Sequence, residues 1–109
     1  MAEVLKSLGQ SAPGAVLTDL YTVPASKQTV IGNLVVCNQA TSAKTFRVTF
    51  APAGAADAAV HRLYYDTSIP ASETLEILKG LTMATTDVLR VYGVDTNVSF
   101  TLFGDEMDV

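Results

Sequence analysis

The chain has 109 residues, of which 49% are hydrophobic and 17% are charged, and its formal net charge is −4. A chain of this length forms one domain and can bury roughly two-thirds of the surface of its unfolded state. Its charged fraction lies below the ~25% usual for soluble domains, so either the core is large or a partner covers apolar surface. We favour the partner.

The charge pattern argues against nucleic acid as that partner. The seven basic residues lie singly along the sequence, whereas a phosphate backbone is bound by clustered lysine and arginine. Cys37 is the only cysteine and lies in the most apolar segment, so we expect a buried, unreactive thiol. The sequence has neither an apolar run of about 18 residues nor a basic segment before an apolar one. We therefore expect no membrane span and no secretion signal.

Residues 1–14 (MAEVLKSLGQSAPG) are expected to form an N-terminal arm outside the domain. Val4, Leu5 and Leu8 have the spacing of one helical turn, and the glycine and proline residues that follow would stop it from growing. Two interpretations stay open: the segment is a frayed terminus, or it docks on a neighbouring subunit. In the second case, Val4, Leu5 and Leu8 are the candidate subunit contacts.

Two segments in the middle of the chain organise the predicted fold. Val30–Cys37 is mostly apolar and β-branched, which is typical of a strand covered on both faces. Thr45–Phe50 alternates between apolar and polar residues, the pattern of a half-exposed strand. Between them, Gln39–Ala43 is a small polar loop within the usual length of a hairpin connection. We therefore expect the two strands to pair as an antiparallel hairpin.

The remaining strands are predicted from alternating patterns bounded by turn residues. They are Ala15–Val23, Val60–Asp66, Glu73–Lys79, Asp87–Tyr92 and Val98–Leu102, with Leu81–Thr86 as a short connecting strand or loop. One core should contain the inward faces of two strands: Phe46, Val48, Phe50, Val98, Phe100 and Leu102. The last five residues, 105–109, are acidic and are expected to form a mobile tail.

This pattern predicts a single all-β domain over residues 15–104. We expect an antiparallel β-sandwich of about seven to eight strands, either a jelly roll or Ig-like, with a small barrel as the alternative. Fewer than about one residue in ten should be helical, far below the roughly one-third typical of soluble domains.

The search for chemistry is mostly negative. His61 is the only histidine, so no two-histidine metal site is possible, and no nucleophile motif accompanies it. Asp66, Asp87 and Asp95 lie at predicted strand ends, where aspartate favours turns. We expect no enzyme and no cofactor or metal. Tyr64, Tyr65 and Tyr92 could stack on sugars, as in a β-sandwich lectin, but tyrosine in strands more often packs with its polar tip at the surface.

Five segments carry a resemblance to a known family: LYTVP, LVVCN, TFRVTFAPAG, LYYD and VSFTLFG. They are Leu20–Pro24, Leu34–Asn38, Thr45–Gly54, Leu63–Asp66 and Val98–Gly104. In this combination the chain resembles a family of small virion-associated structural proteins of tailed bacteriophages, over about Leu17 to Gly104. The sequence differs from the pattern at Ser26, where the turn often carries glycine, and its acidic end does not align.

The resemblance implies a structural component of a phage virion, assembled in the cytoplasm of the host bacterium and present in multiple copies. It leaves open whether the chain is a capsid cement or decoration protein or a tail, neck or fibre-associated protein. The expected partners are copies of itself in a homo-oligomer, for which a trimer is one form, and other virion proteins such as the major capsid protein or tail proteins. Nucleic acid and membrane are not expected.

The alternative is a carbohydrate-binding module that recognises host surface glycans. Tyrosines grouped on one exposed face would favour it, whereas apolar surface facing other copies would favour the virion protein. An enzyme would be reconsidered only if His61 lay with two carboxylates in a pocket.

Overall fold

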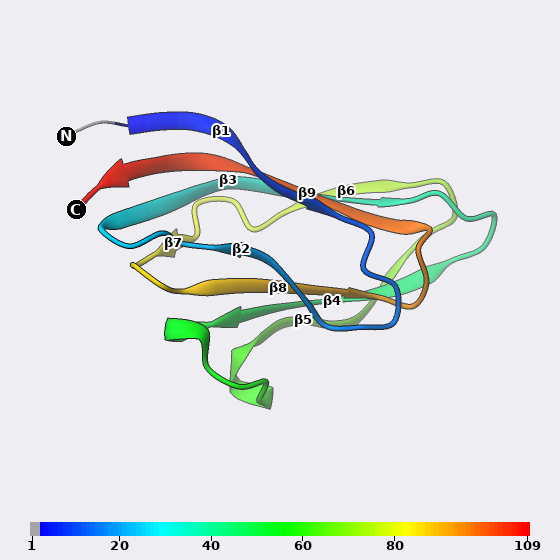
Figure 1. Ribbon diagram of the computed structural model, residues 1–109. Helices are drawn as coiled ribbons and strands as arrows, with labels where there is room; N and C mark the ends of the chain where they lie inside the picture. Colours follow the sequence, from blue (N-terminus) through cyan, green and yellow to red (C-terminus); the bar gives the residue numbers. More distant parts are fainter. Residues whose placement is uncertain (1–2) are drawn as a thin grey trace.

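Two antiparallel sheets face each other in the computed structural model, which describes residues 3–109 and the side chains from Lys6 onward (Figure 1). The five-stranded sheet contains, in spatial order, β1 (Glu3–Ser11), β9 (Val98–Asp108), β3 (Lys27–Asn38) and β6 (Thr74–Ile77), with β7 (Thr82–Met83) also paired to β3. The four-stranded sheet contains β2 (Thr18–Thr22), β8 (Val88–Gly93), β4 (Lys44–Ala51) and β5 (Arg62–Ile69).

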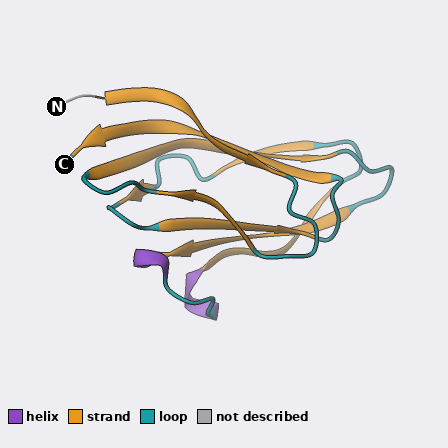
Figure 2. Cartoon of the chain, in the orientation of Figure 1, coloured by secondary structure: helices purple, strands orange, loops and turns teal. Residues whose placement is uncertain are grey.

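The predicted all-β sandwich is confirmed, and the described residues form no closed barrel. The strand order β1-β9-β3-β6 facing β2-β8-β4-β5 is that of an eight-stranded jelly roll, to which β7 is added. Helical structure in residues 3–109 is limited to two 3-10 turns of three residues each, Pro52–Gly54 and Ala59–His61 (Figure 2). The expected low helical content is therefore confirmed.

The predicted hairpin between the two central strands is wrong. β3 belongs to the five-stranded sheet and β4 to the four-stranded sheet, so the loop between them crosses from one layer to the other. A short loop suits either connection, so its length does not decide between them. In the structure the buried side chain of Asn38 holds the crossing. Its Nδ2 donates to the carbonyl oxygens of Ser42, Ile69 and Pro70, and its Oδ1 accepts from the backbone N–H of Ala40.

The expected N-terminal arm is also corrected, because Glu3–Ser11 is a strand of the sheet and pairs with β9. The register of this pair shifts between Ser7 and Gly9, so Leu8 is an extra residue at a β-bulge. The bulge interrupts the alternation by which the sequence would have revealed the strand. Residues 1 and 2 lie outside the described part of the chain.

The expected acidic tail is a strand as well. β9 continues to Asp108, so the boundary predicted at residue 104 is wrong. Its acidic residues suit a strand here because two of them are paired: Glu106 with Lys6, and Asp108 with Lys27. Pairing with a lysine offsets the repulsion between neighbouring carboxylates, which would otherwise favour a solvated tail outside the sheet.

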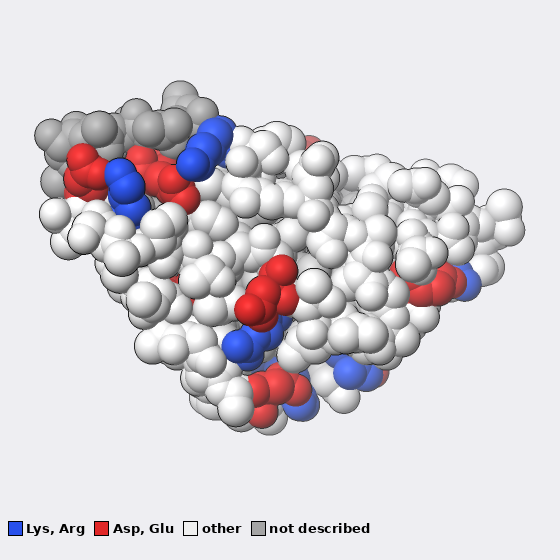
Figure 3. Space-filling model, viewed as in Figure 1, with Lys and Arg blue, Asp and Glu red and all other residues white. Residues whose placement is uncertain are grey.

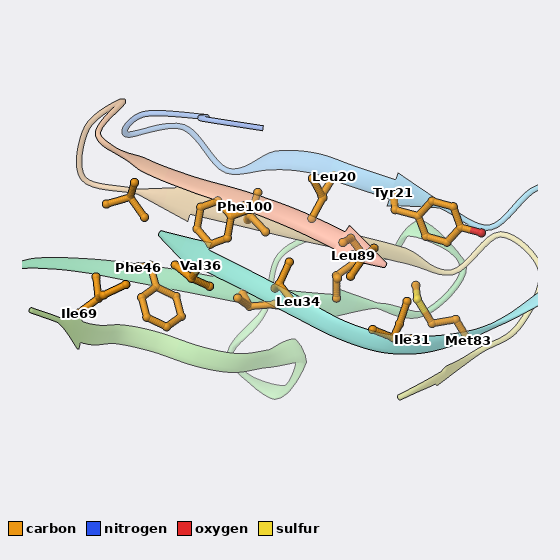
Figure 4. Packing of buried hydrophobic residues seen from close by; sticks show 14 of the residues in the cluster. Leu20, Tyr21, Ile31, Leu34, Val36, Phe46, Ile69, Met83, Leu89 and Phe100 are labelled. Carbon is orange, nitrogen blue, oxygen red and sulfur yellow. The ribbon is translucent and has the colours of Figure 1, made fainter. Parts of the chain in front are cut away.

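The core lies between the sheets and draws side chains from both (Figure 4). Phe46 of β4 meets Phe100 of β9 edge to face, with ring centroids 6.2 Å apart. Five of the six predicted core residues are buried, and Phe50 is half-buried against the same cluster. Several further side chains complete the cluster, among them Leu20, Val23, Ile31, Leu34, Val36, Ile69, Met83, Leu89 and Val91.

One end of the core is polar. Tyr21 points its hydroxyl away from the apolar cluster in Figure 4 and donates it to Glu106 Oε2 at 2.5 Å, so the Thr29 hydroxyl donates to the Tyr21 oxygen at 2.7 Å. Glu106 Oε1 lies 2.7 Å from Lys6 Nζ. Burial, with Glu106 beside it, raises the pKa of Tyr21, while Lys6 and then Tyr21 hold the pKa of Glu106 below its usual value. This network ties β1, β2, β3 and β9 together.

The expectation that β3 is covered on both faces is only half met. Ile31, Leu34 and Val36 are buried inward, but Val35 and Cys37 alternate with them and are half-buried on the outer face. Cys37 is therefore not the fully buried thiol predicted from the sequence. The chain itself covers one face of a strand whose composition suits two covered faces.

Candidate functional site

Three arginines lie together on the outer face of the four-stranded sheet. Thr49 of β4 is the Cα partner of both Arg62 on β5 and Arg90 on β8. Residues directly opposite each other share one face of a sheet, and Arg47 shares that face with Thr49 because they are two residues apart. We call Arg47, Arg62 and Arg90, with the tyrosines and aspartates that contact them, the arginine face.

A β-bulge in β5 shapes the centre of the arginine face. Phe46 is the partner of Thr67 and Val48 is the partner of Tyr64, so Arg47 faces two residues, Tyr65 and Asp66. Asp66 has a φ of 50°, in the left-handed region that aspartate tolerates better than most residues. The bulge turns both of these side chains toward Arg47.

The guanidinium of Arg47 is consequently held from several sides. Its centre lies 4.3 Å from the ring centroid of Tyr65 and 4.4 Å from that of Tyr92, its Cα partner on β8. Its Nε donates to Asp66 Oδ1 at 2.6 Å, and its Nη2 donates to Oδ2 at 3.3 Å. Hydrogen bonding to Arg47 lowers the pKa of Asp66. The contacts fix a long, flexible side chain in one geometry.

The loop of residues 52–61 folds over the other part of this face, below β4 in Figure 1. Arg62 Nη2 donates to Asp57 Oδ2 at 3.0 Å, and Arg90 Nη1 donates to the carbonyl oxygen of Ala55 at 2.6 Å. Arg90 Nε also donates to Asp19 Oδ1 at 2.8 Å. Thr49 lies on this outer face yet is only 1% exposed. The loop and the two arginines thus cover the middle of β4.

The arginine face is balanced in charge, since each arginine is paired with one aspartate. In the view of Figure 3, acidic and basic side chains lie beside one another on a surface that is otherwise uncharged. Arginine and tyrosine are enriched where proteins bind other molecules, above all when packing has already ordered them. The arginine face therefore has the ordered arginine and tyrosine side chains that are typical of a binding surface.

The residues singled out from the sequence do not gather here. The side chains of Val4 and Leu5 lie outside the described part of the structure, while Leu8 packs against the chain's own core. Leu8 is only partly buried, so the role of Val4, Leu5 and Leu8 as subunit contacts stays a prediction. His61 lies in a 3-10 turn, not in a strand as expected.

The aspartates predicted at strand ends have separate structural roles. Asp87 accepts from the backbone N–H groups of Ala53 and Ala84, and Asp95 is paired with Lys44. Asp66, by contrast, lies inside β5 at the bulge. Among the described residues, no group of three or more histidines, cysteines and carboxylates is placed to hold a metal ion.

The arginine face was not predicted, because its arginines lie singly along the sequence. Alternation did place Arg47 and Arg90 on the outward side of their strands. What it lacked was the register of β4 against β5 and β8, which brings residues 15 to 43 positions apart into one cluster. Register depends on pairing between distant segments and leaves no local signal.

Comparisons of the chain with protein-family models, with curated proteins and with solved structures found no match. In the part of the chain that the structure describes, no helix has the length and hydropathy needed to cross a membrane.

Proposed function

We propose that the chain is a structural component of a tailed-bacteriophage virion that assembles in multiple copies through the outer face of its five-stranded sheet. The observation that carries the proposal is the apolar composition of β3 on both faces. The core takes one face, while Val35 and Cys37 remain half-buried on the other. Phe103 of β9, the Cα partner of Asn33, is 43% exposed beside them.

The outer face of the five-stranded sheet carries one carboxylate directly beside these residues: Glu76 of β6 is the Cα partner of Val35 and accepts a hydrogen bond from Asn33 Nδ2 at 2.8 Å. Thr101 and Ser99 of β9 are the partners of Val35 and Cys37, so hydroxyl groups and methyl groups alternate across the two strands. Removing water from such hydroxyl and methyl groups costs little free energy, so this part of the surface can pack against another sheet. The resemblance to virion-associated proteins adds the setting in which many copies meet. Jelly rolls recur in viral capsid proteins, although that is an analogy of fold.

The second candidate, a glycan-binding module, has one observation in its favour. Tyr65 and Tyr92 lie on one outer face, and Tyr65 is 51% exposed. Against it, Arg47 lies over both rings and Arg62 lies 4.9 Å from the Tyr65 centroid, where a sugar would have to stack. Tyr64 instead packs beside Phe46, with centroids 5.8 Å apart. The virion protein is therefore the better supported proposal.

Sedimentation velocity at low and high salt tests the self-association. We expect oligomers in both, because burial of apolar surface is insensitive to screening. Val35→Lys should weaken association by about tenfold or more, since it introduces a charge into the contact. Ser68→Lys, an exposed position on the other sheet, is the matched control and should associate like the wild type.

Thermal unfolding of each variant separates lost association from lost folding. A wild-type chain that stays monomeric at high concentration in both salts would contradict self-association. A folded Val35→Lys variant that associates normally would move the contact away from this face. Deleting the N-terminal segment would be a fair test if it were a separate arm. It is not a fair test here, because the deletion would remove β1 from the sheet.

A further inference from the structure

The loop of residues 52–61 is attached to the sheet mainly by arginine side chains. Its residues are small and exposed, except for the half-buried Ala55 and His61. Its first turn places Ala53 and Gly54 at φ values of 52° and 73°, both in the left-handed region. Asp57 contacts Arg62, and two loop carbonyl oxygens accept from Arg90, while the backbone N–H of Ala53 donates to Asp87 Oδ1 at 2.9 Å. Segments held by exposed polar contacts open more readily than segments held by a core.

Asp57 is the carboxylate by which the loop contacts the arginine face. Arg62 bonds it in a two-pronged contact, with Nε at 3.4 Å and Nη2 at 3.0 Å. Arg47 and Arg62 both lie over the ring of Tyr65, at 4.3 and 4.9 Å, so their charges are close together. Hydrogen bonding to Arg62 lowers the pKa of Asp57, and the charges of Arg90 and Arg47 act in the same direction.

Another carboxylate could nevertheless displace Asp57 from Arg62 at little cost in free energy. Their side chains are 41% and 30% exposed, and exposed ion pairs contribute little to stability. Departure of the loop would free Arg62 and the Nη groups of Arg90, and would uncover Thr49 between them. Arg47 would remain fixed alongside, through Asp66 and the two tyrosines.

We propose that residues 52–61 form a displaceable cover over a carboxylate-binding site made by Arg62 and Arg90 beside Arg47, and that acidic side chains of a neighbouring protein replace Asp57 there. Every side chain that these arginines bond to is a carboxylate: Asp57, Asp19 and Asp66. The planar, two-pronged contact of guanidinium with carboxylate is already formed.

The inference deepens the proposed function, since it gives a virion protein a place where an acidic neighbour binds. The site can be tested without any particle. Its failure would leave the self-association and the virion measurements untouched.

The experiment is titration of a hexaglutamate peptide into the wild-type chain and into Asp57→Asn, followed by calorimetry at physiological salt. We expect Asp57→Asn to bind about three- to fivefold more tightly, the gain expected when an exposed ion pair no longer competes. Asp95→Asn is the matched control. It removes the same charge from a pair with Lys44 at similar exposure, 37% for the aspartate, and should bind like the wild type.

Two further measurements make the interpretation specific. Adding Arg62→Gln to the Asp57→Asn variant should abolish the gain in affinity. Amide hydrogen exchange over residues 53–59 should increase when the peptide binds to the wild type, because the cover opens. Thermal unfolding confirms that each variant is folded.

Several results would overturn the proposal. Equal gains for Asp57→Asn and Asp95→Asn would show an effect of net charge alone. Absence of hexaglutamate binding to all variants at millimolar concentration would remove the site. Tighter binding of oligothymidylate than of hexaglutamate would make it a phosphate site. Peptide binding without increased exchange in the loop would show that the loop is no cover.

Discussion

Replacing Phe100 by alanine is expected to lower the free energy of unfolding by roughly 3–5 kcal/mol, the usual cost of truncating a buried phenylalanine. Phe100 is 1% exposed and meets Phe46 across the two sheets. The change would remove apolar surface from the core and leave a cavity that the close-packed strands cannot fill. Part of the loss would come from the ring pair itself.

The control for this variant lies on the same strand. Phe103 points to the opposite face and is 43% exposed, so Phe103→Ala should cost less than about 1 kcal/mol when the chain is too dilute to associate. Denaturant unfolding of both variants measures the difference. If Phe100→Ala cost less than about 1 kcal/mol, the inward face of β9 would have been assigned wrongly.

Replacing Asn38 by alanine is expected to cost about 2–4 kcal/mol, because buried groups would be left without hydrogen-bond partners. The side chain of Asn38 is fully buried. It donates to three carbonyl oxygens and accepts one backbone N–H, joining the β3–β4 crossing to the end of β5.

Asn97→Ala is the matched control for Asn38. Asn97 is exposed in the turn before β9, so its loss should cost less than about 1 kcal/mol. The two variants are compared by denaturant unfolding at neutral pH. Equal costs would mean that the Asn38 bonds do not hold the crossing between the sheets.

The fold class and most of the core follow from alternation along single strands. Phe46, Val48, Phe100 and their neighbours alternate with polar residues, and that pattern depends on no distant partner. Elements that break the alternation were missed. The bulge at Leu8 concealed β1, and the charged residues at the end of β9 read as a tail because their partners, Lys6 and Lys27, are more than 80 positions away.

Topology and the candidate site required the structure. A short loop after Asn38 fits a hairpin and a crossing between sheets equally well. The hydrogen bonds of the buried Asn38 side chain accompany the crossing, and the sequence does not reveal them. The arginine face depends on register between three strands and on a bulge at Asp66 that a local pattern does not encode. Of the two covered faces predicted for β3, the chain covers one, and cover for the other stays a prediction.

The most direct test of the proposed virion role is the copy number of this chain in purified virions of a tailed phage whose genome carries the sequence, measured by quantitative mass spectrometry after density-gradient purification and a high-salt wash. The account predicts that the chain stays with the particle in at least about six copies, the smallest symmetric set expected at a neck or baseplate, or in hundreds on a shell or tail tube. Its absence from washed particles, with all of the protein recovered free in the lysate, would contradict a structural role in the virion.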